Sequence, residues 1–319
     1  MLTGKRLIAD IKTYQPDPGE LAFWWLGQLG YIIKTERLVF AVDAYLDDNQ
    51  ARLIPPLLAP AELSGVNFFI GTHDHSDHID RKSWPALAAA SPDAKFAVPA
   101  KIAKTLPEEL GIDPLRFIGL DEGVSYADDN LGVSLRALPA AHEFLDRDPD
   151  TGLHPSIGVV IECGGMRIFH SGDSCKYDGM ESKIKSQGKI DLMFVPINGR
   201  DGKRYRANII GNMDFREAVD LAGAVKPGLV IPGHYEMFES NSENPMQFAD
   251  YMEAKYPEQN FQICRHGVRT VYRLSDQEMH GRTDALAVWS SNFELEEMDK
   301  TQDRTIHQED RLTGYRKVN

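Results

Sequence analysis

The feature that most constrains this chain is the segment 72–78, which reads Thr72-His73-Asp74-His75-Ser76-Asp77-His78. It follows directly on the apolar run 66–71, which predicts a buried strand, so the polar cluster is expected where a strand ends and a loop begins. Neutral imidazole and carboxylate groups bind divalent transition metals, and two metals a few ångströms apart need this density of ligands. His73 and His75 alternate as on an extended backbone, and Asp77 and His78 follow beyond a turn. The segment favours a metal site over a polar loop that is merely rich in histidine.

Three further residues extend the candidate site. His142, Asp173 and His234 each follow an apolar run that ends in a loop. Such strand ends are where α/β folds collect their chemistry, because a rigid scaffold there carries variable loops. A lone histidine after a strand is more often a hydrogen-bonded structural residue, so only the combination is informative. The candidate metal ligands are His73, His75, Asp77, His78, His142, Asp173 and His234.

With these residues the chain resembles the metallo-β-lactamase superfamily and, within it, the L-ascorbate-6-phosphate lactonase-like branch. The resemblance spans residues 21–274 and rests on the segments 73–78, 171–174 and 232–235, on His142, and on an opening hairpin at 25–30 and 42–46. It implies an α/β (α+β) fold, a four-layer αββα sandwich of two mixed sheets flanked by helices. Strands alternating with helices at 81–90, 101–110, 215–225 and 246–255 suit that architecture, whereas the N-terminal lead reads as polar and without a helix.

The resemblance also implies roles. His73, His75 and His142 would form one metal site, Asp77, His78 and His234 the other, and Asp173 would bridge them. Activated water would attack a carbonyl or phosphorus centre, with Asp77 accepting or delivering a proton. One or two divalent ions are expected; Mn²⁺ is favoured by the resemblance, and His/Asp ligation also admits Zn²⁺ or Fe²⁺.

Composition narrows the class of protein. A formal charge of -13 argues against a nucleic-acid or membrane surface. Cys163, Cys175 and Cys264 show no disulfide or zinc-ribbon spacing, which suits reduced thiols; Cys175 is interpreted as a small residue beside the site rather than a ligand. The first twenty residues contain no apolar h-region, so we expect no secretory signal and a cytoplasmic protein.

A basic stretch at 198–206 suggests how substrate binds. It follows a predicted strand at 192–197 and holds four cationic side chains in an acidic protein. Arginine binds phosphate or carboxylate through two parallel donors, so Arg200 and Arg204 are the predicted anion contacts, with Asn198 and Tyr235 completing the pocket. The alternative is a solvated loop whose charges pair with surface acids.

Three further polar residues near these segments are expected not to bind metal. His170 is expected to be a core residue, and Asp43 is expected to accept a hydrogen bond from a metal-binding imidazole. His154 reads as an exposed loop histidine, with a lid over the site as the alternative.

The chain divides into a hydrolase domain at 1–274 and a polar extension at 275–319. The extension either packs on its own domain or forms an arm that reaches a neighbouring subunit in a homo-oligomer, with Trp289 and Phe293 as anchors.

These features predict a metal-dependent hydrolase, and the resemblance implies that it opens a lactone in a small anionic sugar derivative such as L-ascorbate 6-phosphate. A phosphodiesterase is the enzymatic alternative, and a non-catalytic ligand-binding protein is the alternative from another class.

Overall fold

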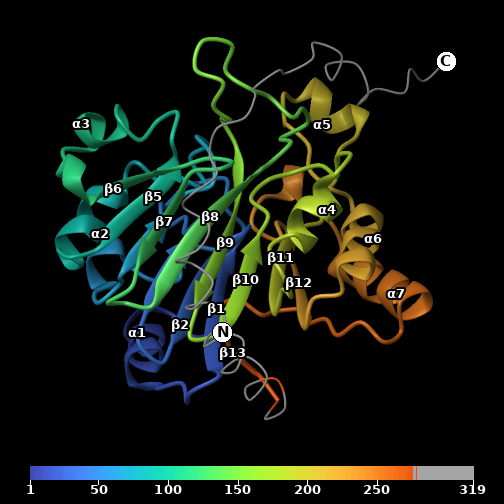
Figure 1. Cartoon of the computed structure of the whole chain (residues 1–319). Helices are drawn as coiled ribbons and strands as arrows, with labels where there is room; N and C mark the ends of the chain where they lie inside the picture. Colours follow the sequence, from blue (N-terminus) through green and yellow to red (C-terminus); the bar gives the residue numbers. More distant parts are fainter. Residues whose placement is uncertain (276–277, 279–319) are drawn as a thin grey trace, which may run out of the picture. The chain divides into compact units, whose positions relative to one another are not determined.

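The computed structural model describes residues 1–275 and 278, and Met1–Tyr272 form one compact unit. That unit contains two mixed sheets (Figure 1). The first has seven strands in the order β13 (Arg269–Arg273), β1 (Glu20–Gly27), β2 (Gly30–Thr35), β3 (Val39–Val42), β4 (Phe68–Ile70), β5 (Lys95–Pro99), β6 (Phe117–Leu120). The second has six, in the order β12 (Leu229–Gly233), β11 (Leu192–Pro196), β10 (Met166–His170), β9 (Ile157–Cys163), β8 (Val133–Pro139), β7 (Ser125–Asp128).

Both sheets combine antiparallel and parallel pairing. Strands β1, β2 and β3 are antiparallel neighbours, whereas β3 through β6 run parallel. In the second sheet β7 through β10 are antiparallel and β10 through β12 are parallel. The glycine pair 164–165 forms the turn between β9 and β10.

Helices cover the outer face of each sheet, which gives the predicted four-layer sandwich (Figure 1). The helices on the side of the first sheet are α1 (Gly4–Thr13), α2 (Trp84–Ala90) and α3 (Leu106–Leu110). Those on the side of the second are α4 (Met180–Lys185), α6 (Phe215–Val225) and α7 (Pro245–Lys255), and a short α5 (Gly202–Arg206) follows β11. Three 3₁₀ turns lie at Pro60–Glu62, Pro114–Arg116 and Glu239–Asn241.

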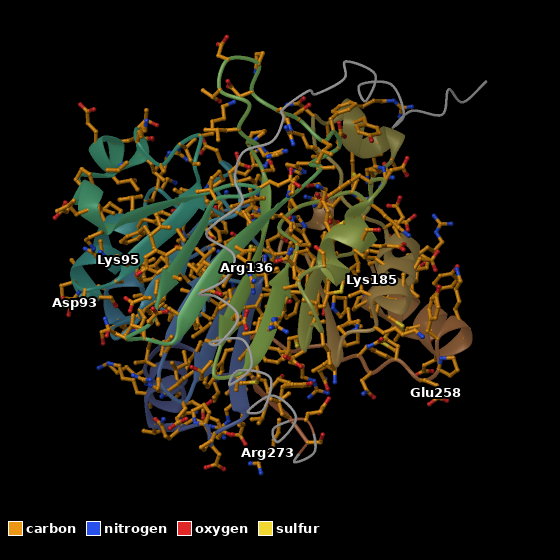
Figure 2. All side chains as sticks on the ribbon, viewed as in Figure 1. Asp93, Lys95, Arg136, Lys185, Glu258 and Arg273 are labelled. Atoms are coloured by element: carbon orange, nitrogen blue, oxygen red, sulfur yellow. The ribbon has the colours of Figure 1, made fainter. Side chains whose placement is uncertain are left out.

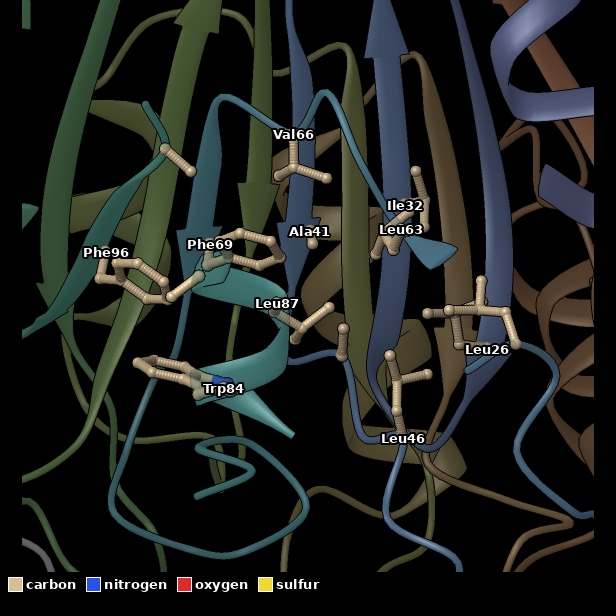
Figure 3. Close-up of a cluster of buried hydrophobic side chains, with 14 of the residues drawn as sticks. Leu26, Ile32, Ala41, Leu46, Leu63, Val66, Phe69, Trp84, Leu87 and Phe96 are labelled. Carbon is tan, nitrogen blue, oxygen red and sulfur yellow. The ribbon is translucent and has the colours of Figure 1, made fainter. Parts of the chain in front are cut away.

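The core lies on both faces of the first sheet. Toward the second sheet, the Phe23 ring lies 5.3 Å from that of Phe194 on β11, edge to face. On the other face, Trp84 and Leu87 of α2 pack over Phe69 and Phe96 (Figure 3). Burial on two faces explains why β1 is an unbroken apolar run instead of an alternating one.

The N-terminal segment corrects the expectation of a polar lead without a helix. Helix α1 buries Leu7 and Ile11 against the first sheet, and Trp24 donates a 2.8 Å hydrogen bond to Asp10. Lys34 of β2 donates to the carbonyls of Ile11 and Lys12, which satisfies acceptors at the end of the helix.

The other predicted helices are present, and some of them start at a different residue. Helix α6 has the predicted bounds, whereas α2 and α3 begin later than expected, because residues 81–83 and 101–105 form turns. In the described residues no helix is long and apolar enough to cross a membrane. The predicted anchors Trp289 and Phe293 lie outside the described residues.

Candidate metal centre

Every candidate ligand lies just beyond the carboxyl end of a strand. His73, His75, Asp77 and His78 follow β4, and the remaining three follow β8, β10 and β12. Side chains that are distant in sequence therefore meet at one edge of the two sheets, as strand ends do in α/β folds.

The structure brings all seven together as overlapping sets whose ligand atoms lie within 4.8 Å of one another. The sets are His73 with His75 and His142, Asp77 with His78 and His234, and His73 with His78 and Asp173. The grouping is the one that the resemblance implies, and the third set joins the first two.

Distances around Asp173 describe how it lies between the two imidazole groups. Its Oδ2 is 3.1 Å from His234 Nε2 and 3.9 Å from His142 Nε2, and its Oδ1 is 3.4 Å from His78 Nε2. Asp173 therefore lies among imidazoles of both sets, where its carboxylate would contact ions held by either set.

Unsatisfied polar atoms test whether the site fits metal ions. His73 Nε2 is buried and has no hydrogen-bond partner among the described atoms, and His78 Nε2 and Asp173 Oδ1 are buried with no polar contact shorter than the 3.4 Å that separates them. A buried polar atom without a partner costs about 1–3 kcal/mol, so such atoms seldom cluster without a ligand. Divalent ions bound by these atoms would account for all three, and the donor set of imidazole and carboxylate suits them.

The electrostatics of the site favour charged carboxylates. Burial alone would raise the pKa of Asp173, but His234 and His78 hold it well below its usual range. Burial works in the same direction on Asp77, and the same two imidazoles lower its pKa. Burial lowers the pKa of His73, and the neighbouring His78 lowers it further. Burial alone would lower the pKa of His78, but Asp173, Asp43 and Asp77 raise it well above its usual value. The site therefore holds charged carboxylates beside a protonated imidazole, and a divalent ion bound there would displace that proton.

Asp43 forms hydrogen bonds with the segment that carries the metal ligands. It is fully buried, and its Oδ2 accepts a 2.7 Å hydrogen bond from His78 Nδ1 and another from the Thr72 hydroxyl. This contact, which the sequence predicts, leaves Nε2 of His78 to face the ligand cluster. His170 donates a 2.8 Å bond to the Leu29 carbonyl and is a core residue, as expected.

Gln28 is a site residue that sequence reasoning missed. It occupies the turn between β1 and β2, and its Nε2 lies 3.1 Å from Asp77 Oδ2 and 3.3 Å from His234 Nε2. Its carbonyl accepts hydrogen bonds from the His234 amide and from Trp25 Nε1. The turn therefore fixes both a carboxylate and an imidazole of the second set.

Backbone strain is concentrated around the same residues. Of the seven non-glycine residues with positive φ in the described chain, five lie in or beside the site, namely Gln28, Asp43, Glu143, His234 and Glu236. Such conformations cost on the order of 1–3 kcal/mol each and persist where the surrounding structure imposes them. Here strong hydrogen bonds of Gln28 and Asp43 supply that constraint.

The four predicted substrate contacts are all packed or hydrogen-bonded within the protein. The Arg200 guanidinium donates two hydrogen bonds to Glu217, at 2.6 and 2.8 Å, and Arg204 pairs with Asp201 and with the Ser242 carbonyl. Asn198 is buried in a hydrogen-bonded pair with Asn241. The remaining contact, Tyr235, is also buried, with its ring 4.6 Å from that of Trp25.

His154 corrects another expectation. It is buried instead of exposed, its Nδ1 lies 2.6 Å from Asp121, and its Nε2 accepts a hydrogen bond from Arg147. Asp121 lies far upstream in the sequence, so no local pattern could reveal this pairing. The residue anchors its loop and does not contact the metal ligands.

Comparison with known proteins agrees with the fold. The sequence profile of the β-lactamase superfamily domain matches residues 39–235, more than half of the chain. The chain therefore belongs to the metallo-β-lactamase superfamily. A UPF0173 metal-dependent hydrolase of Thermococcus onnurineus is 29% identical over 226 residues, which span 70% of this chain and 88% of the relative.

Two solved structures share the fold. Igni18, a metallo hydrolase of Ignicoccus hospitalis, has a TM-score of 0.63 at 20% identity and covers 80% of this chain and 100% of its own. CmlA, a diiron β-hydroxylase of Streptomyces venezuelae, has a TM-score of 0.60 at 16% identity, with 82% of this chain and 55% of CmlA covered. At these identities the likeness concerns the fold alone. Family, fold and clustered ligands together define a metal-dependent hydrolase of the metallo-β-lactamase fold.

Proposed function

We propose that this metal-dependent hydrolase opens a lactone or a similar carboxylic ester. The observation that carries the proposal is the convergence of seven imidazole and carboxylate donors, which Asp173 joins. One of the seven, the Asp77 side chain, is 20% exposed. The resemblance implies a small anionic sugar lactone such as L-ascorbate 6-phosphate, and Mn²⁺ as the metal. That compound is therefore the first substrate to assay.

The ligands divide the chemistry among them. His73, His75 and His142 would hold one divalent ion, Asp77, His78 and His234 the other, and Asp173 would contact both. When bound, such ions polarise a carbonyl oxygen and lower the pKa of water toward neutrality.

Asp77 is the residue that we propose moves the proton. Its Oδ2 is held by the Gln28 amide, 3.7 Å from His78 Nε2, while part of the carboxylate reaches the surface. In hydrolysis water adds to the carbonyl carbon, the C–O bond of the ester breaks, and the leaving alkoxide needs a proton. A carboxylate fixed beside the reacting carbon accepts the proton of water and returns it to the alkoxide.

The segment 72–78 offers a matched pair of variants for the test. Asp77→Asn removes a proposed ligand and proton carrier, whereas Asp74→Asn changes an exposed carboxylate that pairs with Arg81 at 2.5 Å. We expect Asp77→Asn to lose at least a hundredfold in kcat on lactones, and Asp74→Asn to retain the activity of the parent protein. Equal effects of both substitutions would contradict the proposal.

The substrate panel tests the reaction class. Purified protein loaded with Mn²⁺ or Zn²⁺ should hydrolyse members of a panel of lactones and carboxylic esters. Turnover of bis(p-nitrophenyl) phosphate alone would reject the lactonase proposal in favour of phosphodiester hydrolysis. Absence of all turnover in metal-loaded protein would favour a ligand-binding role.

A further inference from the structure

Four exposed apolar side chains lie on the two segments that border His142. Phe144, Leu145, Tyr205 and Ile210 are 47%, 44%, 49% and 38% exposed, and we call them the apolar lip. Single exposed apolar residues are ordinary on soluble proteins, but four on two adjoining segments form a patch of the kind that marks a binding site.

Hydrogen bonds join the two segments of the lip. The Glu143 carboxylate accepts a 3.3 Å hydrogen bond from the Gly211 amide and a further bond from the Tyr205 side chain. The Cys175 thiol donates to the Gly211 carbonyl on the same segment. The loop after β8 and the segment around α5 therefore form one continuous edge.

The lip begins directly at the metal ligands. His142 and Phe144 form an isolated antiparallel bridge around Glu143, whose φ of 68° closes a tight turn. His142 Nε2 lies 3.2 Å from His75 Nδ1, and both residues are partly exposed. The partly exposed edge of the ligand cluster therefore includes His142, which stands two residues before Phe144.

We propose that the lip binds an apolar group of the substrate next to the scissile ester, so that the substrate class is esters and lactones with an alkyl or aryl substituent. This inference rests on the proposed function. It follows from continuity: Phe144 stands two residues after the proposed ligand His142 and bridges to it, so a substituent on a carbonyl held at the ligand cluster can extend along this segment. Burial of each added methylene should raise kcat/KM about three- to fourfold until the lip is covered.

The test is a chain-length series. Metal-loaded protein is assayed on p-nitrophenyl alkanoates from acetate to octanoate and on γ-lactones with alkyl chains of the same lengths. The variants are Phe144→Ser and Ile210→Ser, singly and together. Leu115→Ser is the matched control, because Leu115 is the most exposed large apolar residue of the described chain and lies on the 3₁₀ turn Pro114–Arg116.

We expect kcat/KM to rise with chain length in the parent protein and in Leu115→Ser, and the rise to flatten in the double variant. A readout that needs no turnover is the calorimetric dissociation constant of the product carboxylates butanoate, hexanoate and octanoate. It should fall with length in the parent protein and stay level in the double variant.

The outcomes separate the two proposals. Turnover without a chain-length dependence, or a dependence that the double variant keeps, overturns the inference and leaves the hydrolase proposal standing. The inference is also overturned, and the hydrolase proposal kept, if L-ascorbate 6-phosphate is the best substrate and kcat/KM does not change with alkyl chain length. A change in sedimentation mass of Phe144→Ser, with a flat series in the parent protein, would make the lip an interface between copies and overturn the inference. No turnover of any ester or lactone rejects both.

Discussion

At the scale of single residues, the site depends on side chains that bind no metal themselves. Gln28 and Asp43 orient Asp77 and His78 through bonds of 3.1 and 2.7 Å. Both have positive φ and are fully buried, so their conformations serve the site at a local cost.

Gln28→Leu keeps the volume of the side chain and removes its amide. We expect the affinity for divalent metal, measured by isothermal titration calorimetry, to fall about ten- to a hundredfold, as is common when a partner of a metal ligand is lost. Gln247→Leu, on the exposed side of α7, is the control. Unchanged affinity in Gln28→Leu would show that Asp77 holds its position unaided.

The burial of His266 predicts how the free energy of unfolding depends on pH in the acid range. Burial, with a smaller contribution from Arg52, lowers its pKa from 6.5 to about 4, and its ring stacks 4.0 Å from that of Trp25. Because the unfolded chain takes up a proton first, the stabilisation is complete above pH 6.5 and is lost as the pH falls toward 4. The loss amounts to about 3 kcal/mol at most.

His266→Phe keeps an aromatic ring on Trp25 and removes the titration. In chelator-treated protein, its free energy of unfolding should fall less than that of the parent protein between pH 7 and pH 4. Denaturant titrations at several pH values measure the difference. Parallel curves for the two proteins would contradict the assignment.

At the scale of elements, capping and local pairing explain which predictions succeeded. Helix α6 has its predicted bounds because Asp214 caps it, accepting from the amides of Arg216 and Glu217, while Glu217 accepts from the Asp214 amide. Glu217 also binds Arg200, which the sequence assigns to substrate. A helix cap involves residues that are neighbours in the sequence, so it can be predicted. The ion-pair partner of Arg200 depends on how its loop packs against α6, which the local sequence does not show.

Asp214→Ala tests the cap. The substitution should lower the free energy of unfolding by about 1 kcal/mol, because two amides at the start of α6 lose their acceptor. Chemical denaturation measures the change. Glu258→Ala, at an exposed position labelled in Figure 2, should stay within about 0.5 kcal/mol of the parent protein. If Asp214→Ala is as stable as this control, the cap does not contribute to the stability of the protein.

At the scale of the whole molecule, the sandwich is what the family resemblance implies, and the seven donors could be picked out because each follows an apolar run that forms a strand. It does not predict Gln28, whose contact with His234 spans 206 positions and carries no chemical motif. Helix α1 was missed because its two buried side chains, Leu7 and Ile11, stand among polar neighbours. The burial of His154 depends on Asp121, 33 positions away. The site contacts that the sequence did not predict join residues that are far apart in the chain.

The stoichiometry of bound metal tests the central claim most directly. Elemental analysis after dialysis, together with calorimetric titration, should give two divalent ions per chain for the parent protein. His142→Ala and His234→Ala should each lose one ion, because each removes a donor from a different set. A parent protein that binds no divalent ion, or variants that both retain two, would contradict a paired metal centre.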